Sequence, residues 1–341
     1  MSKQKMVAAA ALWLGLAASA RAEPGAALVT LLGADEASFV KAIKEANRLQ
    51  REGNLRAAAA ALSGAVPDAE RFGRLDLVLN NLALIKQDLG HFTEAEALLK
   101  RSISLCERMS RPNRLAQAVN NLAFLYLETD RCAKANRLYA RFGPNGPDGV
   151  DHSAPEFANW LNTRGTVEHC LGEYNEAEAL YRQALVVYAK SSAPHDVSAM
   201  SARNNLALLH EQTRRYEQAL ALYTDVLTAL EGGARTPAGE RARTLGNLAA
   251  VCDALGRRLE AEKHILESMA LMERAVGPEH PAVAALLLQY ARLLRRLHRN
   301  AEAKPLERRA AAIRAKLGTE ASARYIVDAA DLLRRRVRRE R

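Results

Sequence analysis

The sequence predicts an all-α protein, a right-handed superhelix of about seven helical hairpins with a capping helix at its C-terminal end. The main observation is a pattern, clearest in residues 80–100, that returns along the chain at steps of 40, 42, 42, 42 and 42 residues. Its anchor positions are Gly90, Asp130, Gly172, Arg214, Gly256 and His298. A fixed period over six copies is typical of stacked repeats, and no segment of any length alternates apolar and polar residues as a strand does.

Each recurrent residue type has a physical role in a helix–turn–helix unit. The first helix (helix A) of several copies is predicted to end at a glycine, which accepts the left-handed backbone of a tight turn: Gly53, Gly90, Gly172 and Gly256. A small residue five positions later lets the second helix (helix B) lie close to helix A: Ala58, Ala95, Ala135, Ala177, Ala219, Ala261 and Ala303. Bulky residues follow at i+4 on the same face: Leu99, Tyr139, Tyr181, Tyr223 and Ile265.

This order of small residue, turn glycine, alanine and tyrosine resembles the tetratricopeptide repeat over roughly residues 36–317. The 42-residue step, the NNLA and LGEYNEAEALYRQAL segments and the residues 276–281 are similar to the longer variant found in kinesin light chains and many bacterial proteins. The resemblance implies that helix A lines a concave side and that the protein holds another protein in this groove. No long heptad segment is present, so cargo transport is not implied.

The N-terminus has the pattern of a secretory signal peptide. A basic start is followed by an apolar run from Met6 to Ala20 and by Ala20-Arg21-Ala22, which predicts cleavage after residue 22 and a secreted or periplasmic protein. The run of about fifteen residues is shorter than the ~20 that a membrane-spanning helix needs. The alternative is an uncleaved N-terminus that anchors the protein in the inner membrane. Cleavage would remove three basic residues and lower the net charge from +10 to +7.

The rest of the chain divides by its periodicity. Residues 23–35 have no clear period and are expected to be a loose lead-in. The hairpins are expected at about 36–65, 75–108, 113–141, 154–190, 196–230, 237–276 and 282–317. The glycine- and proline-rich segment 143–153 is either a hinge or a longer loop between repeats. Residues 318–341 are expected to form the capping helix, whose arginine-rich end is either a solvated helix terminus or an anion-binding patch.

No catalytic or metal site is evident. The segment His210 to Arg214 begins like a zinc-protease helix, but Arg214 stands where the second histidine ligand is needed. Glu168, His169 and Cys170 are too compact to form a ligand set on their own. There is no phosphate-binding loop, GxSxG elbow or CxxC pair. We therefore expect no enzyme activity, no metal and no cofactor.

Two function classes fit these observations. The first is a non-catalytic scaffold or adaptor that binds an extended peptide or a partner protein in the concave groove. The alternative is a structural or auxiliary subunit of an envelope secretion, polysaccharide-export or enzyme complex. The basic charge would ordinarily suggest nucleic acid. Export argues against nucleic acid and favours an acidic protein, an envelope polymer or a membrane surface as the partner.

Four cysteines occur in a chain that is expected to reach an oxidising compartment: Cys106, Cys132, Cys170 and Cys252. Cys132 starts helix B of hairpin three and Cys170 ends helix A of hairpin four, so antiparallel stacking places both at one rim. The spacing predicts a Cys132–Cys170 disulfide that closes a loop over residues 143–153. The alternative is that all four are small buried thiols. Cys252 is expected to stay free in either case.

A column of amide or hydroxyl side chains stands two residues before the small residue of helix A: Asn81, Asn121, Thr163, Asn205, Asn247 and Gln289. In tetratricopeptide proteins the matching position faces the concave surface, where asparagine can bond the main chain of an extended peptide. Other groove positions make one end apolar (Leu77, Leu84, Phe124) and the other basic (Arg243, Arg292, Arg295). The hypothesis is an extended segment whose acidic end points toward hairpins six and seven. The alternative is that the repeat merely tolerates asparagine at this column.

Overall fold

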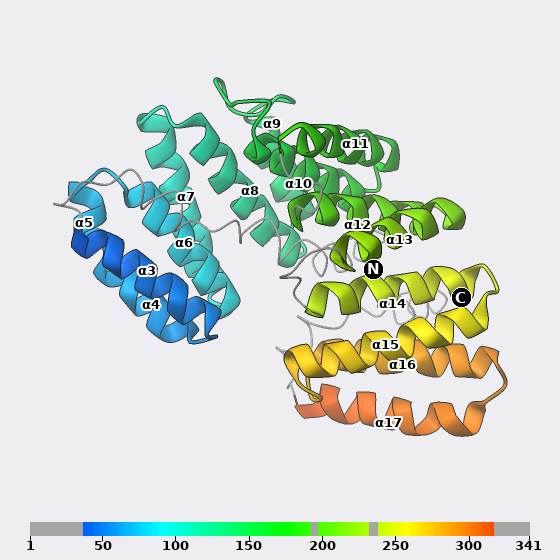
Figure 1. Cartoon of the computed structure of the whole chain (residues 1–341). Helices are drawn as coiled ribbons and strands as arrows, with labels where there is room; N and C mark the ends of the chain where they lie inside the picture. The colour runs from blue at the N-terminus through cyan, green and yellow to red at the C-terminus, as the bar shows by residue number, and fades with distance from the viewer. Residues whose placement is uncertain (1–36, 192–196, 232–237, 317–341) are drawn as a thin grey trace, which may run out of the picture.

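The computed structural model describes residues 37–191, 197–231 and 238–316. Within these ranges the chain forms helices and no strands, and the helices pair into seven hairpins that stack as a curved, right-handed superhelix (Figure 1). The predicted fold class is therefore confirmed. The predicted signal peptide (1–22), the lead-in (23–35) and the capping helix (318–341) lie outside the described residues.

The hairpins follow the predicted boundaries closely. They are α3 (Ala37–Arg51) with α4 (Leu55–Gly64), α6 (Leu75–Asp88) with α7 (Phe92–Arg108), α8 (Pro112–Glu128) with α9 (Cys132–Ala140), α10 (Pro155–Leu171) with α11 (Tyr174–Ser191), α12 (Val197–Gln212) with α13 (Tyr216–Glu231), α14 (Ala238–Ala254) with α15 (Arg258–Val276), and α16 (Pro281–Arg296) with α17 (Asn300–Lys316). A short helix that was not predicted, α5 (Val66–Arg71), connects the first two hairpins.

Every hairpin turn contains one residue with positive φ. Glycine holds this position in hairpins one, two, four and six, with φ of 77°, 79°, 90° and 79° at Gly53, Gly90, Gly172 and Gly256. In hairpins three, five and seven the residues are Asp130, Arg214 and His298, with φ of 58°, 62° and 63°. A left-handed backbone costs a non-glycine residue about 1–2 kcal/mol. The turn geometry is thus kept even where the sequence makes it less favourable.

The alanine column of the B helices is buried completely. Ala58, Ala95, Ala135, Ala177, Ala219, Ala261 and Ala303 all have 0% exposure. The bulky column beside it is equally buried, with Leu99, Tyr181, Tyr223 and Ile265 at 0% and Tyr139 at 2%. The helices of one hairpin therefore meet through a small residue flanked by a large one, as the sequence predicts.

Consecutive hairpins meet through the B helix of one and the A helix of the next. From α6 to α16, consecutive A helices are also in contact with one another. In a curved stack, the helices of the inner layer lie closer together than those of the outer layer. Because consecutive A helices are in contact, the A helices line the concave side. We call the partly exposed side of these helices the inner face.

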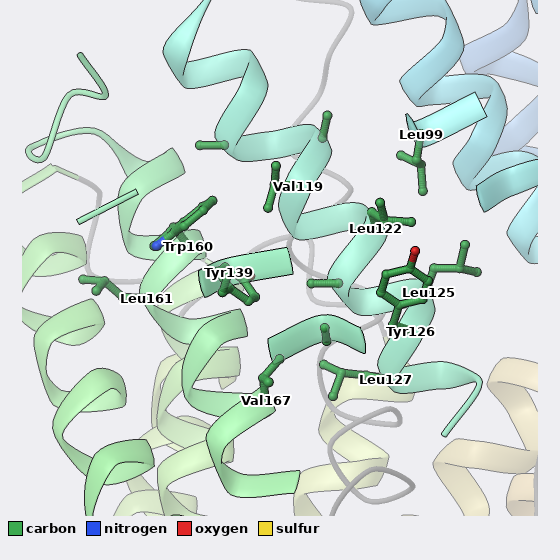
Figure 2. Packing of buried hydrophobic residues seen from close by; sticks show 14 of the residues in the cluster. Leu99, Val119, Leu122, Leu125, Tyr126, Leu127, Tyr139, Trp160, Leu161 and Val167 are labelled. Carbon is green, nitrogen blue, oxygen red and sulfur yellow. The ribbon is translucent and has the colours of Figure 1, made fainter. Parts of the chain in front are cut away.

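Hairpin three differs from the others because its B helix, α9, is cut short. The chain continues as a loop that packs on the core, with Val150 only 8% exposed and Phe142 edge-on to Trp160 of α10, ring centroids 6.1 Å apart. Trp160 is fully buried and also meets Tyr139 of α9 edge-on at 4.6 Å (Figure 2). The Asp151 amide donates to Asn113 Oδ1 (3.1 Å), and the Arg164 guanidinium donates to the Pro144 carbonyl (3.0 Å). Contacts to α8 and α10 on both sides fit the longer-loop interpretation of residues 143–153.

The structure joins Cys132, at the start of α9, to Cys170, near the end of α10, as a disulfide. The two Cα atoms lie 6.3 Å apart, and 38 positions separate the residues in the chain. Cys106 and Cys252 are buried and unpaired. The cross-link joins the first turn of α9 to the last turn of α10 and so ties the short hairpin three to hairpin four.

Side-chain bonds group the hairpins in pairs. A glutamate on the first B helix binds an arginine in the second turn: Glu96–Arg131 at 2.6 Å, Glu178–Arg215 at 2.7 Å and Glu262–Arg299 at 2.7 Å. Hairpins three, five and seven have Asn136, Leu220 and Lys304 at the glutamate position. Between the second and third pairs, Arg257 instead meets the exposed Glu217, about one turn earlier on α13, at 3.1 Å. We call each such pair a double hairpin: α6–α9, α10–α13 and α14–α17.

Gly165 on α10 tests how closely the two helices of a hairpin approach. A Cβ atom at this position would lie 2.8 Å from the Tyr181 ring and 3.3 Å from Leu180 Cβ. Gly165→Ala should therefore destabilise the protein by about 1 kcal/mol, because overpacking outweighs the usual gain of alanine in a helix. Urea unfolding measures the change. Gly239→Ala on α14, where nothing lies within 4 Å of the added atom, is the control and should be neutral or stabilising; equal effects of both changes would refute the close approach.

The disulfide should contribute measurably to stability. Reduction of the Cys132–Cys170 bond is expected to lower the free energy of unfolding by about 3–4 kcal/mol, because the unfolded chain gains the freedom of a long open loop. Unfolding with and without a reductant measures this difference. In Cys132→Ala/Cys170→Ala protein, the reductant should have no effect. Peptide mapping under non-reducing conditions that finds free thiols at both positions of the wild-type protein would contradict the bond.

Candidate functional site

The predicted groove column does not form a uniform row of exposed side chains. Asn81, Asn247 and Gln289 are half-buried. The middle of the column is buried, with 8% exposure at Asn121, 7% at Thr163 and 2% at Asn205. An extended ligand on the inner face could therefore reach the ends of this column more readily than its centre.

The buried members of the column bond the preceding A helix. Asn121 Nδ2 donates to Asn80 Oδ1 (2.8 Å), and Asn205 Nδ2 donates to Asn162 Oδ1 (3.0 Å). At the third double hairpin, Gln289 Nε2 donates to the Gly246 carbonyl (2.7 Å). These bonds set the register between helices, and they use the donors that the hypothesis assigned to a peptide.

A second set of side-chain bonds between A helices lies about two turns closer to their C-terminal ends. Gln87 donates to Glu128 (2.5 Å), His169 Nε2 bonds Gln212 Oε1 (2.9 Å), and Arg296 donates to Asp253 (2.7 Å). All three lie within a double hairpin. Together with the glutamate–arginine pairs, each double hairpin therefore has at least three side-chain ties between its two members.

The middle double hairpin contains a buried polar network around His169. The ring is fully buried, with Nδ1 3.4 Å from the Tyr181 hydroxyl, which in turn donates to Thr166 Oγ1 (3.3 Å). Burial lowers the pKa of His169 to about 4. The imidazole is therefore neutral near neutral pH and links α10, α11 and α12.

The two ends of the inner face carry the apolar and the basic residues named from the sequence. Leu77, Leu84 and Phe124 are half-buried on α6 and α8. At the other end, Arg243 pairs with Glu240, and Arg295 binds Glu307 on α17 (2.8 Å). Arg292 is half-buried and donates from Nε to the Leu288 carbonyl (3.3 Å). The acidic partners reduce the positive charge that this end presents.

Several interacting residues were not singled out from the sequence. Asn80 and Asn162 stand one position before the predicted column, and Glu96, Glu178 and their arginine partners lie on other faces. The available signal was a doubled period in the glutamates, which occur at Glu96, Glu178 and Glu262, in every second hairpin. The single-hairpin period concealed this longer one.

The described residues contain no group of three or more histidine, cysteine or acidic side chains that could hold a metal ion. His210, the first histidine of the zinc-like segment, is buried in α12. Among the described helices, none is both long and apolar enough to cross a membrane.

Stacked hairpins with a continuous inner layer of A helices define an α-solenoid. The chain matches the tetratricopeptide repeat family over residues 75–141, 156–232 and 240–316. These matches cover more than half of the chain, and the protein therefore belongs to the tetratricopeptide repeat family. Each matched segment spans one double hairpin.

Solved structures share this fold. BtubC (BKLC) from P. vanneervenii is 19% identical with a TM-score of 0.56, covering 67% of this chain and 92% of that chain. A kinesin light chain-like repeat protein from Podosopora anserina is 21% identical with a TM-score of 0.51, covering 61% and 99%. The apo quorum sensor NprR from B. thuringiensis is 14% identical with a TM-score of 0.65, covering 81% and 76%. No curated protein matches the chain.

The buried His169 should make stability depend on pH. An unfolded histidine, with a pKa near 6.5, binds a proton that the folded His169 accepts only near pH 4. The free energy of unfolding should therefore be fully retained above about pH 6.5 and fall by about 3 kcal/mol toward pH 4. Urea unfolding of wild type and His169→Gln over this range isolates the contribution, because the variant keeps all other histidines. Parallel pH profiles would contradict the assignment.

Proposed function

We propose that the protein is a non-catalytic scaffold that holds an extended segment of a partner protein along the inner face. The observation that carries the proposal is the unbroken layer of A helices, whose partly exposed side chains change from apolar on α6 and α8 to arginine on α14 and α16. An extended segment can lie across several helices and bury apolar side chains at one end. Membership of the tetratricopeptide repeat family supports a protein partner.

The partner segment is proposed to be acidic at the end that lies over hairpins six and seven. A carboxylate there would interact with Arg292 and would compete with Glu240 for Arg243 and with Glu307 for Arg295. Charge-assisted bonds from arginine to carboxylate are the strongest that such a surface can offer. At the other end, Phe124 and Leu84 would contact apolar side chains of the partner.

The buried asparagines are proposed to support this surface rather than to bind the partner. Removing Asn121 or Asn205 would leave the bonded partner amide unsatisfied, at a cost of about 1–3 kcal/mol. Asn81, Asn247 and Gln289 remain candidates for contact because they are half-buried. The location is proposed to be outside the cytoplasm. The signal-like N-terminus and the Cys132–Cys170 pair support this location, because disulfides persist in oxidising compartments.

Two substitutions on the inner face test the proposal. Phe124→Glu and Arg292→Glu should each reduce recovery of crosslinked partners from an envelope fraction, and the Arg292→Glu effect should be larger at low salt than at high salt. Partner recovery is measured by mass spectrometry, with thermal unfolding to show that each variant is folded. Val186→Glu, at a site 54% exposed on α11, is the control. Unchanged recovery with folded Arg292→Glu and Phe124→Glu would exclude the inner face as the binding site.

A further inference from the structure

The outer side of α15 carries more exposed large apolar side chains than any other B helix in the described residues. Of the five large hydrophobic residues that are exposed in the described chain, Leu259 (79%), Leu266 (46%) and Val276 (42%) belong to this one helix. The residues equivalent to Leu259 are Thr93, Ala133, Asn175, Glu217 and Ala301, and those equivalent to Leu266 are Lys100, Ala140, Arg182, Thr224 and Arg308. The two leucines are therefore not required by the repeat.

The exposed residues of α15 follow the spacing of a helix–helix seam. The inward side is formed by Ala261, Ile265, Ser268 and Met272, all buried. The opposite side carries Leu259, Lys263, Leu266 and Ala270, all exposed and separated by four, three and four residues. This is the interval of a and d positions in a coiled coil, with leucine at d and with lysine and alanine at a.

The charges around this seam are mainly positive. Three glutamates of α15 are directed to neighbouring elements: Glu262 binds Arg299, Glu267 binds Arg241 (2.9 Å), and Glu273 binds Arg309 (2.7 Å). Lys263 and Arg274 are exposed and have no ion pair among the described residues. Glu260 is the exposed acidic residue that remains. A lysine at a seam position is best accommodated opposite an acidic side chain.

We propose that the outer side of α15, which we call the α15 seam, is a second docking surface and that its occupant is an amphipathic, acidic helix of a partner protein. The heptad-like spacing matches that of a helix packed along α15, and Lys263 and Arg274 can pair with acidic side chains on that helix. The C-terminal residues 334–341 of the same chain, with six arginines and one glutamate, have the wrong charge for this surface. The α15 seam lies on a B helix, away from the inner face, so both surfaces can act at once.

A pair of designed peptides tests the α15 seam in the full-length protein. Both peptides have leucine at a and d; one has glutamate and the other lysine at the flanking positions. Binding is followed by fluorescence anisotropy of a labelled peptide. The acidic peptide should bind at least about tenfold more tightly than the basic one, and Leu259→Glu/Leu266→Glu should weaken it by about tenfold or more. Lys263→Glu should reverse the preference between the two peptides.

Control variants separate this proposal from the inner-face proposal. Val186→Glu on α11 and Arg292→Glu on α16 should leave binding of the acidic peptide unchanged. Absence of binding, equal binding of both peptides, or binding that survives Leu259→Glu/Leu266→Glu would overturn the proposal. Seam-dependent binding to anionic phospholipid vesicles without peptide binding would assign the surface to a membrane. Dimerisation that is lost in Leu259→Glu/Leu266→Glu would assign it to a second copy of the chain. Either result would also overturn the proposal.

Discussion

The stack depends on the close approach of the two helices within each hairpin. The approach is possible because helix B has a fully buried alanine in every hairpin and helix A has a small residue, alanine in most copies and Gly165 in α10. A Cβ atom at Gly165 would lie 2.8 Å from the Tyr181 ring of helix B. A larger residue at either column would separate the helices and expose the tyrosines and leucines beside them. The left-handed turn, the inner layer and the spacing between hairpins all follow from this contact.

The periodic sequence was sufficient to predict the fold because the positions that determine it recur in every hairpin. The alanine column and the turn residues each appear seven times and the bulky column five times, and the helix boundaries agree with the structure to within a few residues. Hairpin three is the exception, because α9 stops early and a packed loop replaces its second half. Such a local change does not alter the 42-residue spacing, so the periodicity cannot reveal it.

The candidate site was predicted less completely because a period identifies positions but not their environment. Adjacent residues on a helix point about 100° apart. The sequence alone does not tell which asparagine of Asn80–Asn81, or of Asn120–Asn121, bonds the neighbouring helix and which faces the groove. In the structure Asn121 turns toward α6, and Asn205 turns toward α10, where each completes a bond between helices. The apolar and basic ends of the inner face follow from the residue types alone, and their part in binding stays a prediction.

The pairing of hairpins limits which insertions and deletions the chain can accept. Hydrogen bonds from Arg215 lower the pKa of Glu178 to about 2, which shows that the glutamate–arginine pairs are well formed. Loss of a single hairpin would leave a partly buried glutamate or arginine without its counterpart, whereas loss of two would leave every remaining pair closed. Insertions and deletions in this array should therefore be accepted in blocks of about 84 residues. Among the described residues, only the hairpin of α3 and α4 stands outside the three pairs.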